Sequence, residues 1–307
     1  MLVAVYLPLV LPALAVPVVR WVAGRLHPAW ASWLVLVSAL VLAVCATFAL
    51  CLLVFAALLA VRLFPRPGHW QVHVVHHLGG VHLPIDLAAS VLLLVFGAMS
   101  VSMGATRFRS LTEARRLAGQ CRGELIVVEA DEPMAHAVPG RPGRIVVSTG
   151  MLAGLAPAER RALLAHERAH LAGGHHLFVA VVDVLAAANP LLRPLTTVIR
   201  YTTERWADEV AAGKVGDRSV VAMAVGKAAL AGRAPVRSDG PRTVATGPVP
   251  RRVAALLASP PAGRVLAVLM SPVGVCAVIA FALVAGSVWF SLDAMNDLHR
   301  TLQLDQH

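Results

Sequence analysis

The sequence predicts a mostly α-helical membrane protein in which four transmembrane helices hold an α+β domain between the third and the fourth. Hydrophobic residues make up 58% of the 307 residues and charged residues only 14%, and the mean hydropathy is +0.72. Both exceed what a soluble fold needs. Four uncharged runs are each long enough to cross about 30 Å of hydrocarbon at roughly 20 residues per helix. Backbone in lipid must satisfy its own hydrogen bonds, so uninterrupted helix is the expected form of these runs.

The apolar runs divide the chain into membrane and non-membrane parts. We expect transmembrane helices at about 2–19, 34–61, 87–106 and 265–292, a domain at 107–264, and a short extracytoplasmic tail at 293–307. The first run could instead be a cleaved signal peptide, but it lacks a basic start and contains Pro8, Pro12 and Pro17. We therefore expect it to remain as a helix.

Basic residues beside the apolar runs predict the orientation. Arg20 and Arg25 follow the first run, which indicates a cytoplasmic first loop. Counting the spans then places the loop 62–86 outside and the inserted domain inside. Four arginines directly after the third run agree with this: Arg107, Arg109, Arg115 and Arg116. We expect a multi-pass protein of the cell membrane, in contact with the lipid bilayer, whose inserted domain is cytoplasmic.

Several functional classes are disfavoured by composition. The net charge is +10, but headgroup contact and topology explain arginines in a membrane-attached domain, and no DNA-binding helix pattern or stacking motif is present. We therefore expect no nucleic-acid partner. The four cysteines include no C-x-x-C pair, so neither a disulfide framework nor a cysteine zinc site is indicated. A transporter is disfavoured because the apolar runs contain no ionisable residue of the kind that lines a transport pathway.

The inserted domain is expected to contain a series of short helices and strands. A basic helix is expected at 111–119, followed by strands at 124–129 and 144–148, which a turn-rich segment separates. Pro157 sits in the favoured first turn of a helix that continues past Leu171. After it come an apolar stretch to 192, helices near 202–212 and 220–231, and a Gly- and Pro-rich loop at 232–250.

The helix that begins at Pro157 carries the motif H-E-x-x-H as His166, Glu167 and His170. Histidines four apart on a helix project from one face, so both imidazoles can bind one Zn²⁺ ion. The glutamate between them is then placed to act as the general base on a water molecule. The motif predicts a zinc hydrolase, with a chance match on a surface helix as the alternative.

Two residues compete for the position of third zinc ligand. His176 completes the pattern H-E-x-x-H-x-x-G-x-x-H with Gly173, but that pattern needs a methionine turn, and the only candidate is Met223 in an apolar helix. Glu204 is the rival, and Asp208 shares its helix face four residues later. A carboxylate at Asp208 can hydrogen-bond a ligating histidine and fix its tautomer. We favour Glu204 over His176, although a solvated acidic face at Glu204 and Asp208 is the simpler alternative.

The segment "LLAHERAH", followed about 34 residues later by "ERWADE", resembles the BlaR/MecR-type integral-membrane zinc metallopeptidases. These are gluzincins related to the HtpX and CAAX prenyl proteases. The resemblance implies a gluzincin-type zinc metallopeptidase domain in which His166, His170 and Glu204 bind Zn²⁺, Glu167 is catalytic and Asp208 is the supporting acid. His175 departs from the pattern, because relatives often carry aspartate there.

The resemblance also implies a role in signal transduction. Sensor members of the family carry a penicillin-binding domain after the fourth span and cut a cytoplasmic repressor. Only some 15 residues follow Leu292 here, so we expect no such sensor domain. The leading interpretation is a zinc endopeptidase that cuts a protein or peptide substrate at the cytoplasmic membrane face. The alternative is a non-catalytic signalling or scaffold protein with a structural metal site, and the sequence predicts no oligomeric state.

Two further groups of residues are candidates for functional roles. His136 and Arg200 are candidates for stabilising the oxyanion of the substrate. In the outer loop, five histidines lie within fourteen residues: His69, His73, His76, His77 and His82. Imidazole binds transition metals and titrates near neutrality, so this cluster is consistent with metal or pH sensing, or with a short helix at the membrane interface.

Overall fold

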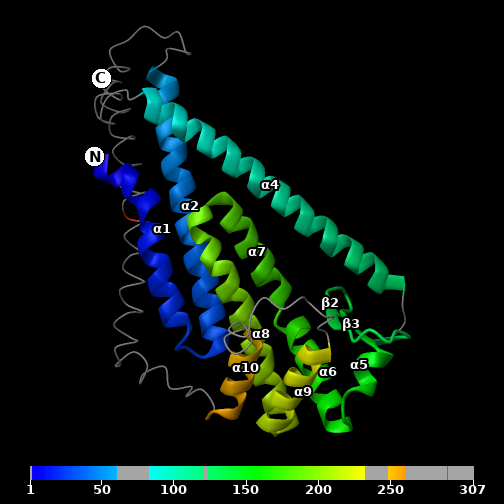
Figure 1. The fold of residues 1–307 in the computed structure, drawn as a ribbon. Coiled ribbons are helices and arrows are strands. Elements are labelled where there is room, and N and C mark those ends of the chain that lie inside the picture. The colour runs from blue at the N-terminus through cyan, green and yellow to red at the C-terminus, as the bar shows by residue number, and fades with distance from the viewer. Residues whose placement is uncertain (1, 61–82, 121–122, 232–247, 260–288, 290–307) are drawn as a thin grey trace.

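The computed structural model describes residues 2–60, 83–120, 123–231, 248–259 and 289, as long helices with a small sheet (Figure 1). The long helices are α1 (Leu2–Ala23), α2 (Pro28–Ala60) and α4 (Leu83–Gln120). The smaller elements are β1 (Leu125–Val128), β2 (Ala135–Val138), β3 (Arg144–Ser148), α5 (Thr149–Ala153), α6 (Pro157–Ala172), α7 (His175–Ala188), η1 (Pro190–Leu192), α8 (Arg193–Val215), α9 (Arg218–Ala231) and α10 (Pro248–Leu257).

Three described helices are long and apolar enough to cross a membrane. Their qualifying segments are Tyr6–Ala23, Pro28–Val54 and Leu87–Arg116. The helices α6 and α7, bent by 56° relative to each other, pass the same test as a pair. The predicted fourth span at 265–292 lies outside the described residues except for Trp289. The described chain is therefore mostly helical and suited to membrane association, and it has candidate membrane helices at the first three expected positions.

The third span does not end where the sequence suggests. Instead of a span to residue 106 and a separate basic helix at 111–119, α4 is one helix of 38 residues. No proline interrupts it after Pro84, and the hydroxyls of Thr106 and Ser110 donate to carbonyls one turn back. The expected domain boundary at 107 thus falls within a continuous helix, which carries the chain from its apolar part to the sheet.

The sheet has three strands in the order β1-β3-β2. β3 is central, parallel to β1 and antiparallel to β2, and its Ile145 and Val147 are fully buried. The sequence predicts β1 and β3 but not β2. Branched apolar residues dominate β1 and β3, whereas the four residues of β2 include two alanines and a histidine and lie between turn-forming residues, so β2 shows no hydrophobic pattern.

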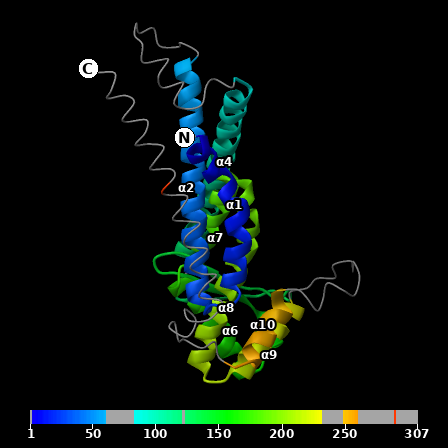
Figure 2. The ribbon, with the colours of Figure 1, turned by 90° about the vertical axis from the view of Figure 1, so that its left-hand side faces the viewer.

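The helices α7 and α8 dock against the apolar long helices. α2 contacts α1, α4, α7 and α8, while α6, α9 and α10 gather at one end of the long helices (Figure 1, Figure 2). The largest buried cluster combines both groups: Val19, Val35 and Leu42 of the apolar helices pack with Val182, Leu195 and Ile199. The inserted domain and the predicted spans therefore share one core.

Ile199→Ala tests this shared core. Ile199 is fully buried between α8 and the long helices, so its truncation leaves a cavity and should lower the free energy of unfolding by about 2–5 kcal/mol. Unfolding of the purified protein in detergent micelles measures the change. Leu230→Ala is the matched control, because that side chain is 69% exposed and its loss should stay within about 0.5 kcal/mol. Equal effects would contradict the shared core.

Candidate metal centre

The local sequence of α6 fixes the positions of its two histidines. Pro157 begins the helix, and the Glu159 carboxylate accepts the Ala156 N–H at 2.8 Å. Such an N-terminal bond satisfies a donor that the helix leaves free, and Lys227 adds an ion pair to Glu159 at 2.7 Å. The helix thus runs without interruption through His166 and His170, which lie one turn apart on the same face.

Glu204 of α8 meets both histidines. The two Nε2 atoms of His166 and His170 lie 3.0 Å apart. Glu204 Oε2 is 3.4 Å from His166 Nε2, and Oε1 is 3.3 Å from His170 Nε2. Among the described residues these three form a group whose ligand atoms all lie within 4.8 Å of one another. Sequence reasoning places the same three side chains together, and the geometry brings them there.

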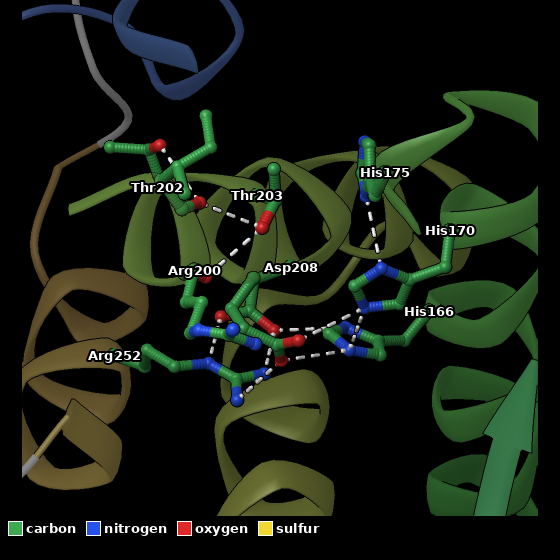
Figure 3. A network of polar contacts seen from close by, with 10 residues as sticks. His166, His170, His175, Arg200, Thr202, Thr203, Asp208 and Arg252 are labelled. Atoms are coloured by element: carbon green, nitrogen blue, oxygen red, sulfur yellow. Dashed lines mark hydrogen bonds and ion pairs between the residues drawn. The ribbon is translucent and has the colours of Figure 1, made fainter. Parts of the chain in front are cut away.

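Asp208 and Arg252 lie beside this group and contact its members (Figure 3). The Asp208 carboxylate is fully buried, and its Oδ1 lies 3.0 Å from His166 Nδ1, off the axis of a straight N–H···O bond. Arg252 of α10 donates Nε to Asp208 Oδ2 at 2.8 Å and Nη2 to Oδ1 at 2.7 Å. Its Nη1 also lies 2.8 Å from Glu204 Oε2. One guanidinium therefore holds both carboxylates of α8 in place.

His175 lies beside His170 as Asp208 lies beside His166 (Figure 3). Its Nδ1 lies 3.0 Å from His170 Nδ1, and its ring packs on Trp206 at a centroid distance of 4.6 Å. When His170 turns Nε2 to the metal group, its Nδ1 carries the hydrogen and donates it to His175. A histidine thus takes the place that relatives often give to aspartate.

Gly173 makes room for the His175 ring. A Cβ atom at Gly173 would lie only 2.4 Å from His175 Nε2, so a larger residue would displace the ring. Gly174 follows with a left-handed φ of 59°, a conformation that glycine adopts without strain, and the chain turns into α7. The glycine in the pattern H-E-x-x-H-x-x-G-x-x-H therefore serves this packing.

His176, the alternative third ligand, lies outside the metal group. It is partly buried at the start of α7, and burial together with the Arg115 charge lowers its pKa. Met223, which would have to form the methionine turn, is 55% exposed in α9. The geometry therefore favours Glu204 over His176 for a site with two histidines.

Charges around the group shift the pKa values of its members. Burial lowers the pKa of His166, but the contacts with Asp208 and Glu204 outweigh burial and raise it to about 9. Burial raises the pKa of Glu204, but the bonds with His166 and His170 and the charge of Arg252 hold it far below its usual range. Without a metal ion, His166 therefore carries a proton at neutral pH, and a bound cation would replace that proton.

The donor set fits Zn²⁺. Two imidazole nitrogens and one carboxylate are the ligands of many catalytic zinc sites, which leave one position open. The Nε2 atoms of His166 and His170 face each other and the carboxylate of Glu204, so a cation between them would satisfy all three lone pairs at once. Asp208 and His175 lie 3.0 Å from the Nδ1 atoms of His166 and His170, the positions from which outer groups orient ligating histidines.

Two cavities flank the metal group. A cavity of about 590 Å³ is lined by α4, β2, α6, α7 and α8, and it contains both candidates for oxyanion stabilisation, His136 and Arg200. A second cavity of about 480 Å³ lies between β2, α6 and α9. The two cavities share four lining residues: Ala135, His166, Glu167 and Glu204. Glu167 is therefore placed at the junction, beside the metal group.

Nothing in the sequence pattern points to Arg252. It lies 44 residues beyond Asp208 and is one of 27 lysines and arginines. The only available signal is physical: two carboxylates on one helix face that point at one site require a cation nearby. That requirement does not say which arginine supplies it.

The comparisons with known proteins agree with a metallopeptidase. Residues 106–188 match the family described as Peptidase family M48, a stretch that includes His166, Glu167 and His170 but ends before Glu204. The match supports a metallopeptidase of that family, a class of hydrolases that is generally zinc-dependent. No curated protein matches the chain, and no solved structure matches it.

Glu204→Gln and His176→Gln together test the third ligand. Glu204→Gln removes the only carboxylate of the metal group, so the Kd for Zn²⁺ should rise by more than the roughly 10–100-fold that loss of an outer hydrogen bond costs. His176→Gln should leave the Kd unchanged. Competition with a chromophoric chelator measures both values. The opposite order would place His176 in the coordination shell.

Arg252→Gln tests the support of the two carboxylates. The fully buried Asp208 would lose the two hydrogen bonds and the charge of Arg252 and keep only its contact with His166, and breaking a buried ion pair from one side costs about 3–5 kcal/mol. Unfolding in detergent with a chelator present should show this loss, and added Zn²⁺ should restore part of it. Arg251→Gln is the control, because that guanidinium packs over the Tyr201 ring instead, 4.7 Å from its centroid. Equal stability of the two variants would contradict the assignment.

Proposed function

We propose that the protein is an integral-membrane zinc endopeptidase that cuts protein substrates at the cytoplasmic face of the membrane. The observation that carries the proposal is the convergence of His166, His170 and Glu204 at a cavity that Glu167 also lines. The match of residues 106–188 to a metallopeptidase family supports the same activity.

The chain's own groups divide the work of hydrolysis. Zn²⁺, held by His166, His170 and Glu204, would supply a Lewis acid that makes water more acidic and polarises a carbonyl oxygen. Glu167 accepts the proton of the attacking water and later gives it to the leaving amine. Asp208 and His175 are positioning residues, since each acts through a ligating histidine.

The shape of the site favours cleavage within a chain over trimming of chain ends. The two cavities share residues at the metal group and are otherwise lined by different elements, α4 and α7 for one and α9 and α10 for the other, which supports a substrate that continues past the metal group on both sides. β2 is one of the two edge strands of the described sheet, and Ala135, His136 and Ala137 line the larger cavity. An edge strand can pair with an extended peptide through main-chain hydrogen bonds.

The position of the site favours substrates near the bilayer. The larger cavity is lined in part by Arg107, Ser110 and Leu111 of α4. The same helix is long and apolar enough to span a membrane. The arginines that follow the spans favour a cytoplasmic location. By its resemblance to the BlaR/MecR type, the protein would act in signal transduction on a substrate such as a cytoplasmic repressor. The histidine cluster at 69–82 lies outside the described residues.

Glu167→Gln tests the activity. The amide keeps the shape of the side chain but cannot accept a proton, so kcat for cleavage of casein by the full-length protein in detergent with Zn²⁺ should fall by about 10²–10⁴-fold. Zinc content should stay at the wild-type level, because Glu167 is not among the three ligands. Glu113→Gln is the control, since that side chain is exposed on α4.

The alternative function gives the opposite result. A signalling or scaffold protein with a structural metal site would keep its phenotype when Glu167 is replaced, and it would lose it only when a ligand such as His170 is replaced. Equal casein cleavage by the wild type and the Glu167→Gln variant would rule out the proposed catalysis.

A further inference from the structure

We propose that Arg107 and Arg200 form a subsite that binds a carboxylate of the substrate, so that the enzyme selects acidic peptides. The proposal rests on the proposed endopeptidase function and names its substrate class. It starts from an ion cluster in the larger cavity that hydrolysis itself does not use.

Three helices contribute to the cluster. Asp183 of α7 is only 7% exposed. Arg200 of α8 donates Nη2 to Asp183 Oδ1 at 2.9 Å and to Oδ2 at 2.7 Å, and Arg107 of α4 donates Nη2 to Oδ2. Both arginines line the cavity, whereas Asp183 does not. The carboxylate therefore lies behind the two guanidinium groups and holds them at the cavity wall.

The cluster has more donors than acceptors. Within the described ranges, Asp183 is the only carboxylate in ion-pair contact with either arginine, so one negative charge faces two positive charges. Each arginine uses a single terminal nitrogen for this contact, and the side chains of Arg107 and Arg200 are 39% and 51% exposed. Guanidinium groups prefer to bind carboxylates through two parallel N–H bonds. Unused N–H groups and one uncompensated charge thus remain available at the cavity.

The acidic side chains of the cavity do not neutralise this charge. Among the described residues, Glu167 and Glu204 are the only acidic ones in its lining, and both lie at the metal centre. Glu204 faces His166, His170 and Arg252 instead. The cavity is therefore polarised, with its acidic groups at the metal and its free positive charge at Arg107 and Arg200.

The spacing suits a peptide that lies across the metal group. Arg200 precedes Glu204 by four residues of α8, a rise of about 6 Å along the helix. An extended peptide advances about 3.3 Å per residue. A carboxylate held at Arg200 would therefore belong to a residue about two or three positions from the bond that is cut.

Two sources of a carboxylate fit this subsite. One is an aspartate or glutamate side chain within the substrate, and the other is the free carboxyl group at the end of a substrate chain. Both present the same planar anion to the guanidinium groups. Matched peptides with an internal glutamate or glutamine, and with a free or amidated end, distinguish the two.

Cleavage of a proteome-derived peptide library by the full-length protein, in detergent with Zn²⁺, is the first part of the test. Mass spectrometry of the products should show acidic residues, or chain ends, enriched at one position within about three residues of the cut. For the best sequence, exchange of that glutamate for glutamine, or amidation of the end, should lower kcat/KM by about 10–100-fold, as expected for loss of a charged hydrogen bond.

Arg200→Gln and Arg107→Gln form the second part. Each variant should lose the preference for the acidic peptide by about tenfold or more, and Arg107→Gln, which is not a candidate for oxyanion stabilisation, should cleave the neutral peptide at the wild-type rate. Because the two residues lie on different helices, the second variant remains informative where the first fails to fold. Arg193→Gln is the matched control, an exposed arginine at the start of the same helix α8. It should keep the preference.

Each other outcome overturns the proposal in a distinct way. Glu167-dependent cleavage without an acidic preference would leave the endopeptidase intact and remove the subsite. Equal loss on acidic and neutral peptides in Arg200→Gln would assign that residue to the reaction itself. Effects that appear only with anionic lipid vesicles would assign both arginines to the membrane surface. Absence of any Glu167-dependent cleavage would remove the endopeptidase and the subsite together.

Discussion

The packing of α7 and α8 into the long apolar helices is the constraint on which the metal centre depends. The three proposed ligands come from two helices and have to meet within a few ångströms. Leu195 and Ile199 are fully buried against α1 and α2 and fix the axis of α8. Glu204 lies on the same helix, just over one turn beyond Ile199. The hydroxyls of Ser32 on α2 and Thr202 on α8 lie 3.0 Å apart and add a polar contact at the same level. Close-packed interiors transmit small displacements, so the position of Glu204 is set by apolar contacts that also build the membrane part.

A chain of aromatic rings connects the same packing to the histidines. Trp33 of α2 contacts Phe178 edge-on at 4.9 Å, and Phe178 contacts Trp206 at 5.9 Å. Trp206 in turn lies against His175, which touches His170. Aromatic pairs at these distances add stability beyond the area that they bury. The orientation of His170 therefore depends on side chains of a predicted span, and the metal centre shares its packing with the long apolar helices.

Those features that depend on local periodicity could be predicted from the sequence. His166 and His170 share a face because of the helical repeat, and Glu204 and Asp208 share one for the same reason, so the metal group required only that two helices face each other. The contribution of Arg252 depends on a tertiary contact with no fixed spacing. β2 was not predictable because its four residues, two of them alanine and one histidine, lie among turn formers and have no distinctive pattern. The extent of α4 was missed because a change from apolar to basic residues does not by itself end a helix.

Charge balance explains why this arrangement suits a divalent cation. Glu167, Glu204 and Asp208 bring three negative charges to the centre and Arg252 brings one positive charge, so with neutral histidines the sum is −2. Uncompensated charge in a buried site is costly, and the raised pKa of His166, about 9, shows one partial response, in which a proton is taken up. A cation of charge +2 replaces that proton and cancels the sum of −2 with both imidazoles neutral, as ligation requires. The second ion cluster has the opposite imbalance, because Arg107 and Arg200 share only Asp183. The metal end of the cavity thus becomes neutral when a cation binds, while the end at Arg107 and Arg200 stays positive. A peptide with an anionic group near its cleaved bond would place that bond at the metal and neutralise the positive end.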